Sequence, residues 1–126
     1  METAGTTIAA IEPTPAAPAG PIDRAHLAHV TFNDRRLERE VLQLFDRQAV
    51  LLVARIRTST PSAVAGLAHT LKGSAVGIGA WHVARTAEAA EKASATGAAE
   101  CDLAIRDLVA AVDEARVSII DMLRAP

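Results

Sequence analysis

The scarcity of aromatic side chains is the feature that most restricts the fold of this chain. Half of its 126 residues are apolar, but the only aromatic residues are Phe32, Phe45 and Trp81. The core must therefore be built from Ala, Leu, Val and Ile, which suits closely packed helices better than a sandwich or a barrel. At this length we expect one domain with a single modest core.

Apolar residues recur at helical spacing along most of the chain after Ile22, and no segment has a convincing strand pattern. This pattern predicts a short helix over about 23–30 and longer helices over about 34–58, 61–76, 80–95 and 99–124. Short connections between long amphipathic helices favour antiparallel neighbours. The expected fold class is therefore all-α, an up-down antiparallel four-helix bundle with a short extra N-terminal helix.

Several residues mark the expected helix ends. Asn33 is a good N-cap for the first long helix, whose inner stripe is expected to include Leu44 and, as its one polar member, Gln48. Thr60, which precedes a proline, marks the start of the next helix. Gly77-Ile78-Gly79 is expected to end that helix in a tight turn.

Residues 1–21 form an Ala-, Thr- and Pro-rich leader that cannot bury enough surface to offset its chain entropy, so we expect it to be disordered and the domain to span 22–126. The longest apolar run, residues 49–54, is too short to cross a bilayer, and no basic residue precedes Arg24 as in a secretory signal. The single Cys101 excludes an internal disulfide and fits a reducing compartment. We therefore expect a cytoplasmic protein without a membrane partner.

The charge balance argues against nucleic acid as a partner. The formal net charge is −2, whereas a protein that binds the phosphate backbone is usually basic. The few aromatic residues are also too scarce to form a base-stacking surface.

The segment that is most informative about function is Ala68-His69-Thr70-Leu71-Lys72-Gly73-Ser74-Ala75. On a wheel of about 100° per residue with Val64 at zero, the apolar residues of this helix fall within about 60° of that direction. His69 lies at about 140°, Gly73 at about 180° and Lys72 at about 80°. His69 is therefore expected on the exposed side, with Lys72 within reach at i+3 spacing.

The outer face of this helix is unusually bare. Around His69 and Lys72 it carries only Ser62, Ala65, Gly66, Gly73, Val76 and Gly77. Gly66 and Gly73 together forfeit about 2 kcal/mol of helix propensity, which calls for a reason. A smooth surface around one imidazole is what docking of another protein requires, so these residues are predicted to bind a partner. The alternative is that the small residues pack against a neighbouring helix.

An exposed imidazole is largely neutral at pH 7, and its free nitrogen lone pair is a competent nucleophile toward an activated phosphoryl group. The positive charge of Lys72 disfavours the imidazolium form and can neutralise phosphoryl oxygens during transfer. The chain has no Gly-rich phosphate loop and no acidic cluster beside His69 to hold Mg²⁺. We therefore expect no cofactor and no metal on this chain, because both the metal and the high-energy phosphate must come from a partner.

The motif resembles that of histidine-containing phosphotransfer (HPt) domains of bacterial two-component phosphorelays. The resemblance covers about residues 22–123 and rests on the segment around His69 together with Ile78-Gly79-Ala80, Val83-Ala84, Ala87 and Glu91. It implies that His69 is the phosphoacceptor, that Lys72 assists electrostatically and that Gly73 permits close approach. Ala75 and Ala90 depart from the residues usual in the family, and Gly77 adds a further glycine that we place just past the helix.

The resemblance also implies partners. Phosphate would arrive from, and leave to, an aspartate on receiver domains of response regulators or hybrid histidine kinases, with Mg²⁺ held by the receiver. A monomer is expected. The chain would then be a phosphocarrier with a phosphohistidine intermediate, without an ATP site, and not an autonomous kinase.

Three other classes of protein are alternatives to a phosphocarrier. A degenerate helical docking module would bind a signalling partner without carrying phosphate, and its mark would be loss of His69 or Lys72, both of which are present. An enzyme with its own machinery lacks a convergent triad, dyad or metal set. A kinase dimerisation domain is expected to have an acidic residue directly after the histidine, where Thr70 stands.

The remaining polar residues of note have ordinary expected roles. We expect His26, His29 and His82 to be surface histidines, Trp81 to be a capping aromatic, and Cys101 to be half-buried and inert. Glu88, Glu91 and Lys92 are expected on a solvated face, and Arg35, Arg36 and Arg39 on the outer face of their helix.

Overall fold

The computed structural model describes residues 20–125, so the predicted leader, 1–21, lies almost entirely outside the described residues. All regular structure within 20–125 is helical, which confirms the all-α prediction. The helices are α1 (Arg24–Val30), α2 (Arg35–Thr58), α3 (Pro61–Ile78), α4 (Trp81–Ala93) and α5 (Ala98–Arg124).

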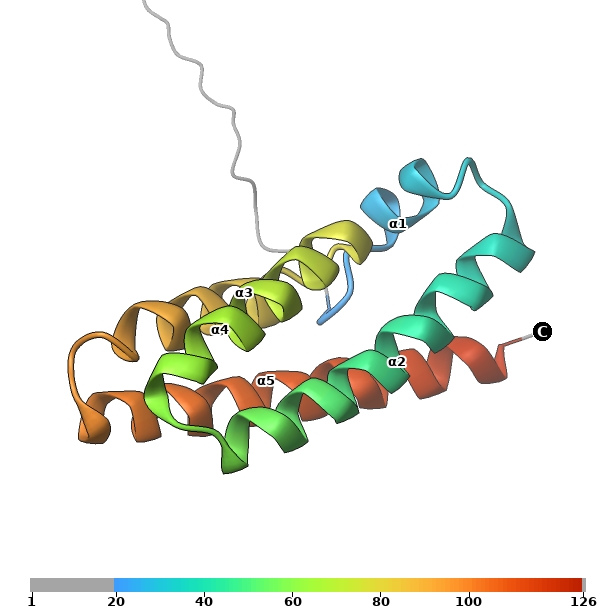
Figure 1. Ribbon diagram of the computed structural model, residues 1–126. Helices are drawn as coiled ribbons and strands as arrows, with labels where there is room; N and C mark the ends of the chain where they lie inside the picture. Colours follow the sequence, from blue (N-terminus) through green and yellow to red (C-terminus); the bar gives the residue numbers. More distant parts are fainter. Residues whose placement is uncertain (1–19, 126) are drawn as a thin grey trace, which may run out of the picture.

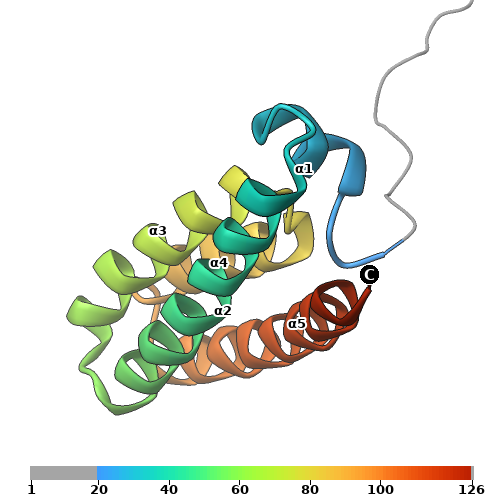
Figure 2. The ribbon, with the colours of Figure 1, turned by 90° about the vertical axis from the view of Figure 1, so that its right-hand side faces the viewer.

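The four long helices surround one core. Each of α2, α3 and α4 packs against the next helix along the chain, and α5 closes the ring against α2. Successive long helices run in opposite directions (Figure 1), and Figure 2 shows the short α1 lying across one end of the set. Of the 24 buried hydrophobic residues within 20–125, ten are alanines, so small side chains let these helices approach closely.

The start of α2 differs from the expectation. Asp34, not Asn33, is the N-cap, and its carboxylate accepts hydrogen bonds from the backbone N–H groups of Arg36 at 2.9 Å and Leu37 at 3.1 Å. Asn33 instead adopts a left-handed conformation with φ of 59° in the connection from α1. Asparagine tolerates this region better than most residues, and Asp34 one position later then has the extended geometry that an N-cap needs.

The inner stripe of α2 also departs from the prediction at Leu44, which is 57% exposed. The buried residues of α2 centre on Phe45, and Leu44 lies about 100° away from it around the helix. Gln48, the expected polar member of the stripe, is half-buried and accepts a 2.7 Å hydrogen bond from the Ser74 hydroxyl of α3. This bond satisfies its side-chain oxygen between the two helices.

The end of α3 lies two residues beyond the predicted end, because Gly77 continues the helix. Gly79 adopts the left-handed conformation with φ of 81°, and the N–H of Ala80 bonds to the carbonyl of Ala75 at 2.8 Å. This is the usual glycine stop of a helix, which needs positive φ at a single position. The placement of Gly77 just past the helix was therefore wrong.

Two arginines join α2 to α5. Arg39 donates from Nη1 to the carbonyl of Leu123 at 2.8 Å, so it does not simply lie on the outer face as expected. Arg116 donates from Nε to Asp46 at 2.7 Å. These two contacts join the first half of α2 to the second half of α5.

The attachment of α1 involves His26, which the sequence pattern had assigned to the surface, together with Asp23 and Trp81. The N–H of Asp23 bonds to the carbonyl of Gly79 at 2.9 Å, and the indole Nε1 of Trp81 donates to the Asp23 carboxylate at 2.9 Å. His26 packs edge-on against Trp81, and its Nε2 lies 3.1 Å from the carbonyl of Val76. His26 is thus not an ordinary surface histidine, whereas His29 and His82 are exposed as expected.

Replacing Asp23 with alanine is expected to loosen α1 and to lower the free energy of unfolding by about 1 kcal/mol, because an N-cap and a partner of Trp81 are lost together. The indole of Trp81, followed by the N–H of His26, lowers the pKa of Asp23 below its ordinary value of 3.8. A lowered folded-state pKa means that this stabilisation is present above about pH 4 and is lost as the pH falls further.

Denaturant titration and the fluorescence of Trp81, the only tryptophan, would measure both effects. The emission maximum of the Asp23→Ala protein at neutral pH should match that of the unchanged protein at acid pH. Equal stability and equal emission at pH 7 would show that Asp23 does not hold α1.

Candidate functional site

His69 lies at the middle of α3 on the side away from the core. The buried residues of α3 are those predicted from the wheel, namely Val64, Ala68, Leu71, Ala75 and Ile78, with Leu67 partly buried. This places the His69 side chain outward, with 68% of its surface exposed. The exposure of the imidazole that the sequence pattern predicts is therefore observed.

Glu91, on α4, holds one edge of the imidazole. Nδ1 of His69 lies 3.2 Å from Oε2 and 3.3 Å from Oε1 of the Glu91 carboxylate. An ionised carboxylate only accepts hydrogen bonds, so Nδ1 must carry the proton and donate it. In the neutral ring this leaves the lone pair on Nε2, which has no hydrogen-bond partner among residues 20–125.

A second charged group lies beside the histidine. Lys72 of α3 is half-buried, and its Nζ lies 3.9 Å from Oε2 of Glu88 on α4. The same Oε2 atom accepts from Nζ of Lys92 at 3.2 Å. Lys72 follows His69 at i+3 spacing in α3, and it shares a carboxylate with Lys92, which the sequence pattern had placed on a solvated face.

The bare outer face of α3 is present in the structure. Among its predicted members, Ser62, Gly66, Gly73, Val76 and Gly77 are exposed, and Ala65 is half-buried. Apart from the backbone of its own helix, a Cβ added at Gly66, Gly73 or Gly77 would meet no atom of residues 20–125 within 4 Å. The alternative that these glycines make room for a neighbouring helix is therefore wrong, and the outer face of α3 is open to a partner.

The sequence pattern did not predict that two acidic residues of α4 contact the residues of the His69 motif. Glu88 and Glu91 were expected on a solvated face, yet they reach across from α4 to Lys72 and His69 respectively. Glu91 was also noted as part of the family motif, but not as a partner of His69. The helical hairpin formed by α3 and α4 supplies the missing information, because it brings positions 22 residues apart into hydrogen-bond distance.

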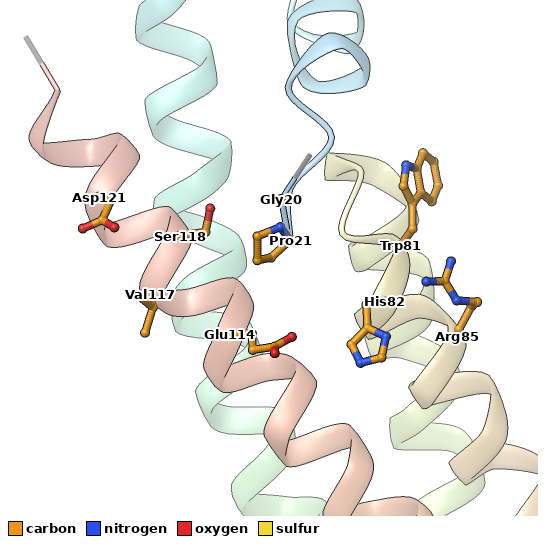
Figure 3. Close-up of a pocket in the computed structure, with 9 residues that line it drawn as sticks. All are labelled: Gly20, Pro21, Trp81, His82, Arg85, Glu114, Val117, Ser118 and Asp121. Atoms are coloured by element: carbon orange, nitrogen blue, oxygen red, sulfur yellow. The ribbon is translucent and has the colours of Figure 1, made fainter. Parts of the chain in front are cut away.

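A groove of about 810 Å³ lies elsewhere, between α4, α5 and the segment that precedes α1. In Figure 3, His82 and Glu114 extend toward this groove from α4 and α5, and Pro21 lies near its upper end. None of the residues that line it belongs to the outer face of α3. This groove is therefore separate from His69, whose side chain is 68% exposed.

The described residues form neither a metal site nor a membrane-spanning helix. Residues 20–125 contain no group of three or more His, Cys, Asp or Glu side chains placed to hold a metal ion. Within the same residues, no helix has the length and apolar character needed to span a membrane.

Cys101 is buried rather than half-buried, and its burial raises the pKa of the thiol.

These features define a small helical module that presents one oriented imidazole on an exposed helix face. The sequence model of the family described as Hpt domain matches residues 36–116, which is well over half of the chain. The protein belongs to this family, whose members are phosphotransfer modules of two-component signalling and interact with receiver domains of response regulators. The match begins after α1, so α1 is an addition to the matched region.

Comparison with curated proteins gave no match, and neither did comparison with solved structures.

Proposed function

We propose that this protein is a phosphorelay carrier that accepts a phosphoryl group from a receiver aspartate on Nε2 of His69 and passes it to another receiver. One observation carries the proposal more than any other. Glu91 binds Nδ1 of His69, and the remaining ring nitrogen has no hydrogen-bond partner among residues 20–125, on a side chain that is 68% exposed. A nucleophile held by one edge and open at the other is the arrangement that transfer between proteins requires.

The transfer step follows from this tautomer. The Nε2 lone pair forms the P–N bond while the bond between phosphorus and the aspartyl oxygen breaks, and its electron pair stays on the receiver carboxylate. The ring keeps its Nδ1 proton and becomes positively charged. Glu91 faces this charge at 3.2 Å and stabilises it, and onward transfer to a second receiver reverses the same step.

Lys72 would act on the phosphoryl oxygens, whose negative charge it can partly neutralise from the same helix face. The described residues of this chain offer no metal site, and we propose that Mg²⁺ comes with the receiver, as the family resemblance implies. The chain thus needs no ATP site of its own and functions as a carrier rather than a kinase.

The docking surface would be the outer face of α3, formed by Ser62, Ala65, Gly66, Gly73, Val76 and Gly77 around His69. The alternating helix directions and the ring of helix contacts support the assignment of an up-down four-helix bundle with α1 added at one end. In such a bundle α3 is held rigidly by α2 and α4, so the receiver meets a preformed surface. We propose that the monomer is the active form.

The direct test is transfer from a phosphorylated receiver domain. The full chain, incubated with such a receiver, is expected to acquire a phosphate that is labile in acid and stable in base, as a phosphohistidine is. A panel of receivers from the same cell would identify the partners. If no receiver transferred phosphate, the carrier function would be disproved.

Replacing Glu91 with alanine is expected to slow phosphoryl transfer about tenfold, because the ring loses the group that fixes its tautomer and balances its charge. Nitrogen-15 NMR of the imidazole would show the cause directly. The proton should reside on Nδ1 in the unchanged protein and move largely to Nε2 in Glu91→Ala. The variant Glu91→Gln, whose amide oxygen still accepts a hydrogen bond, should retain the tautomer and lose less activity. Identical rates for all three proteins would rule out this role.

The second candidate is a degenerate module that docks a partner without carrying phosphate. It predicts binding to a receiver with no label on the protein. The presence of both His69 and Lys72, each beside a carboxylate of α4, favours the carrier.

A further inference from the structure

Glu88 has two lysine partners on a single oxygen atom. Its Oε2 lies 3.2 Å from Nζ of Lys92, four residues along α4, and 3.9 Å from Nζ of Lys72 on α3. The side chain of Lys72 is 33% exposed, whereas that of Lys92 is 75% exposed. The shorter ion pair thus lies within α4, and the longer one joins α4 to the residue predicted to assist the phosphoryl group.

The two carboxylates of this α4 face have separate tasks. Glu91 contacts the ring of His69, and Glu88 contacts Lys72. Glu88 has no hydrogen bond or ion pair with His69 among residues 20–125, so any influence on the phosphoryl group must act through Lys72 or through space.

We propose that Glu88 competes with the phosphoryl group for Lys72, and that it thereby sets how much phosphate rests on His69 at equilibrium with a receiver. This inference rests on the proposed carrier function. Before transfer, Lys72 pairs with Glu88. After transfer, the same ammonium group has a doubly charged phosphoryl group as a second possible partner, so every contact with Glu88 weakens the contact with phosphate.

Lys92 weakens the competition between Glu88 and the phosphoryl group for Lys72. Because Lys92 remains on Glu88 at the shorter distance, Glu88 keeps a cation when Lys72 turns to the phosphate. The hydrogen bond from Lys92, with the added charge of Lys72, lowers the pKa of Glu88 below its ordinary value. Glu88 is therefore ionised throughout the physiological range, so it opposes phosphorylation of His69 at any working pH. The carrier would hold its phosphate loosely and release it readily, which is useful in a relay intermediate.

The test is the phosphoryl-transfer equilibrium between the full chain and a receiver that phosphorylates it, approached from both sides. Glu88→Gln is expected to shift this equilibrium toward the carrier by about twofold to fivefold, the range of partly exposed ion pairs. Lys92→Met should shift it toward the receiver, since Glu88 then holds Lys72 more tightly. Glu40→Gln on α2 removes an equivalent carboxylate that pairs with Arg36 at i,i+4 spacing, and it should leave the equilibrium unchanged.

The decisive comparison repeats Glu88→Gln in a Lys72→Met background. Competition for Lys72 predicts that the shift disappears there, whereas direct repulsion between Glu88 and phosphate predicts that it persists. A persistent shift, or no shift from Glu88→Gln in the unchanged background, overturns the inference while leaving the carrier function intact. Failure of the unchanged protein to accept phosphate at all would instead overturn the carrier function, and the inference with it.

Discussion

Replacing His69 with glutamine is expected to reduce phosphoryl acceptance from a receiver below detection while leaving the fold unchanged. Glutamine has a side chain of similar length and can still bind Glu91, but it has no nucleophilic nitrogen. Because 68% of the His69 side chain is exposed, the free energy of unfolding should change by less than about 0.5 kcal/mol. The loss can be measured as radiolabel transferred from the receiver, with circular dichroism as the check on folding.

The chain offers matched controls for this experiment. His29 and His82 are also exposed histidines, on α1 and α4, and neither has a hydrogen bond from its ring to another described residue. His29→Gln and His82→Gln should therefore accept phosphate at the unchanged rate. Acid-labile phosphate on the His69→Gln protein, or its loss in His82→Gln, would place the acceptor elsewhere.

Replacing Gly73 with glutamine is expected to weaken transfer by about tenfold to a hundredfold and, at the same time, to stabilise the protein. The added side chain would project from the middle of the docking face, where a receiver must approach His69 closely. Within the protein it meets nothing, since a Cβ at Gly73 has no atom within 4 Å. The helix should gain about 1 kcal/mol from losing a glycine.

Opposite changes in stability and function are the distinctive part of this result. Thermal unfolding would report the gain, and the receiver concentration needed for half-maximal transfer would report the loss. Ala110→Gln, at an exposed position of α5, adds the same side chain away from the face and should leave transfer unchanged. Full transfer by Gly73→Gln would show that the receiver does not cover this part of α3.

The helical fold was predictable because its determinants are local. Apolar residues at helical spacing, the proline after Thr60 and the near absence of aromatic residues all indicated helices, and each expected helix is present. One error at a helix start arose where two neighbouring residues compete for the same role. Asn33 and Asp34 are both good N-caps, and the choice between them depended on the backbone of the connection from α1.

The exposed side of α3 was likewise predictable, because the helix wheel alone separates His69 and Gly73 from the buried stripe. What the wheel could not supply was the partner of each side chain on another helix. The sequence pattern placed His26 and Arg39 on the surface and Gln48 in the inner stripe of α2 as its one polar member. In the structure each of these side chains has a hydrogen bond to a residue at least 26 positions away. Such pairs depend on how two helices are placed against each other.

The sequence by itself determined the helices, the composition of the core and the outward direction of one histidine beside a lysine on a bare face. Only the tertiary structure decided the chemistry of that histidine. The packing of α4 against α3 brings Glu91 to Nδ1 of His69 and Glu88 to Lys72, and so leaves Nε2 as the ring nitrogen without a partner among residues 20–125. The physical reason is that helical periodicity is a property of neighbouring residues, whereas a hydrogen bond between helices depends on their relative position to within about an ångström.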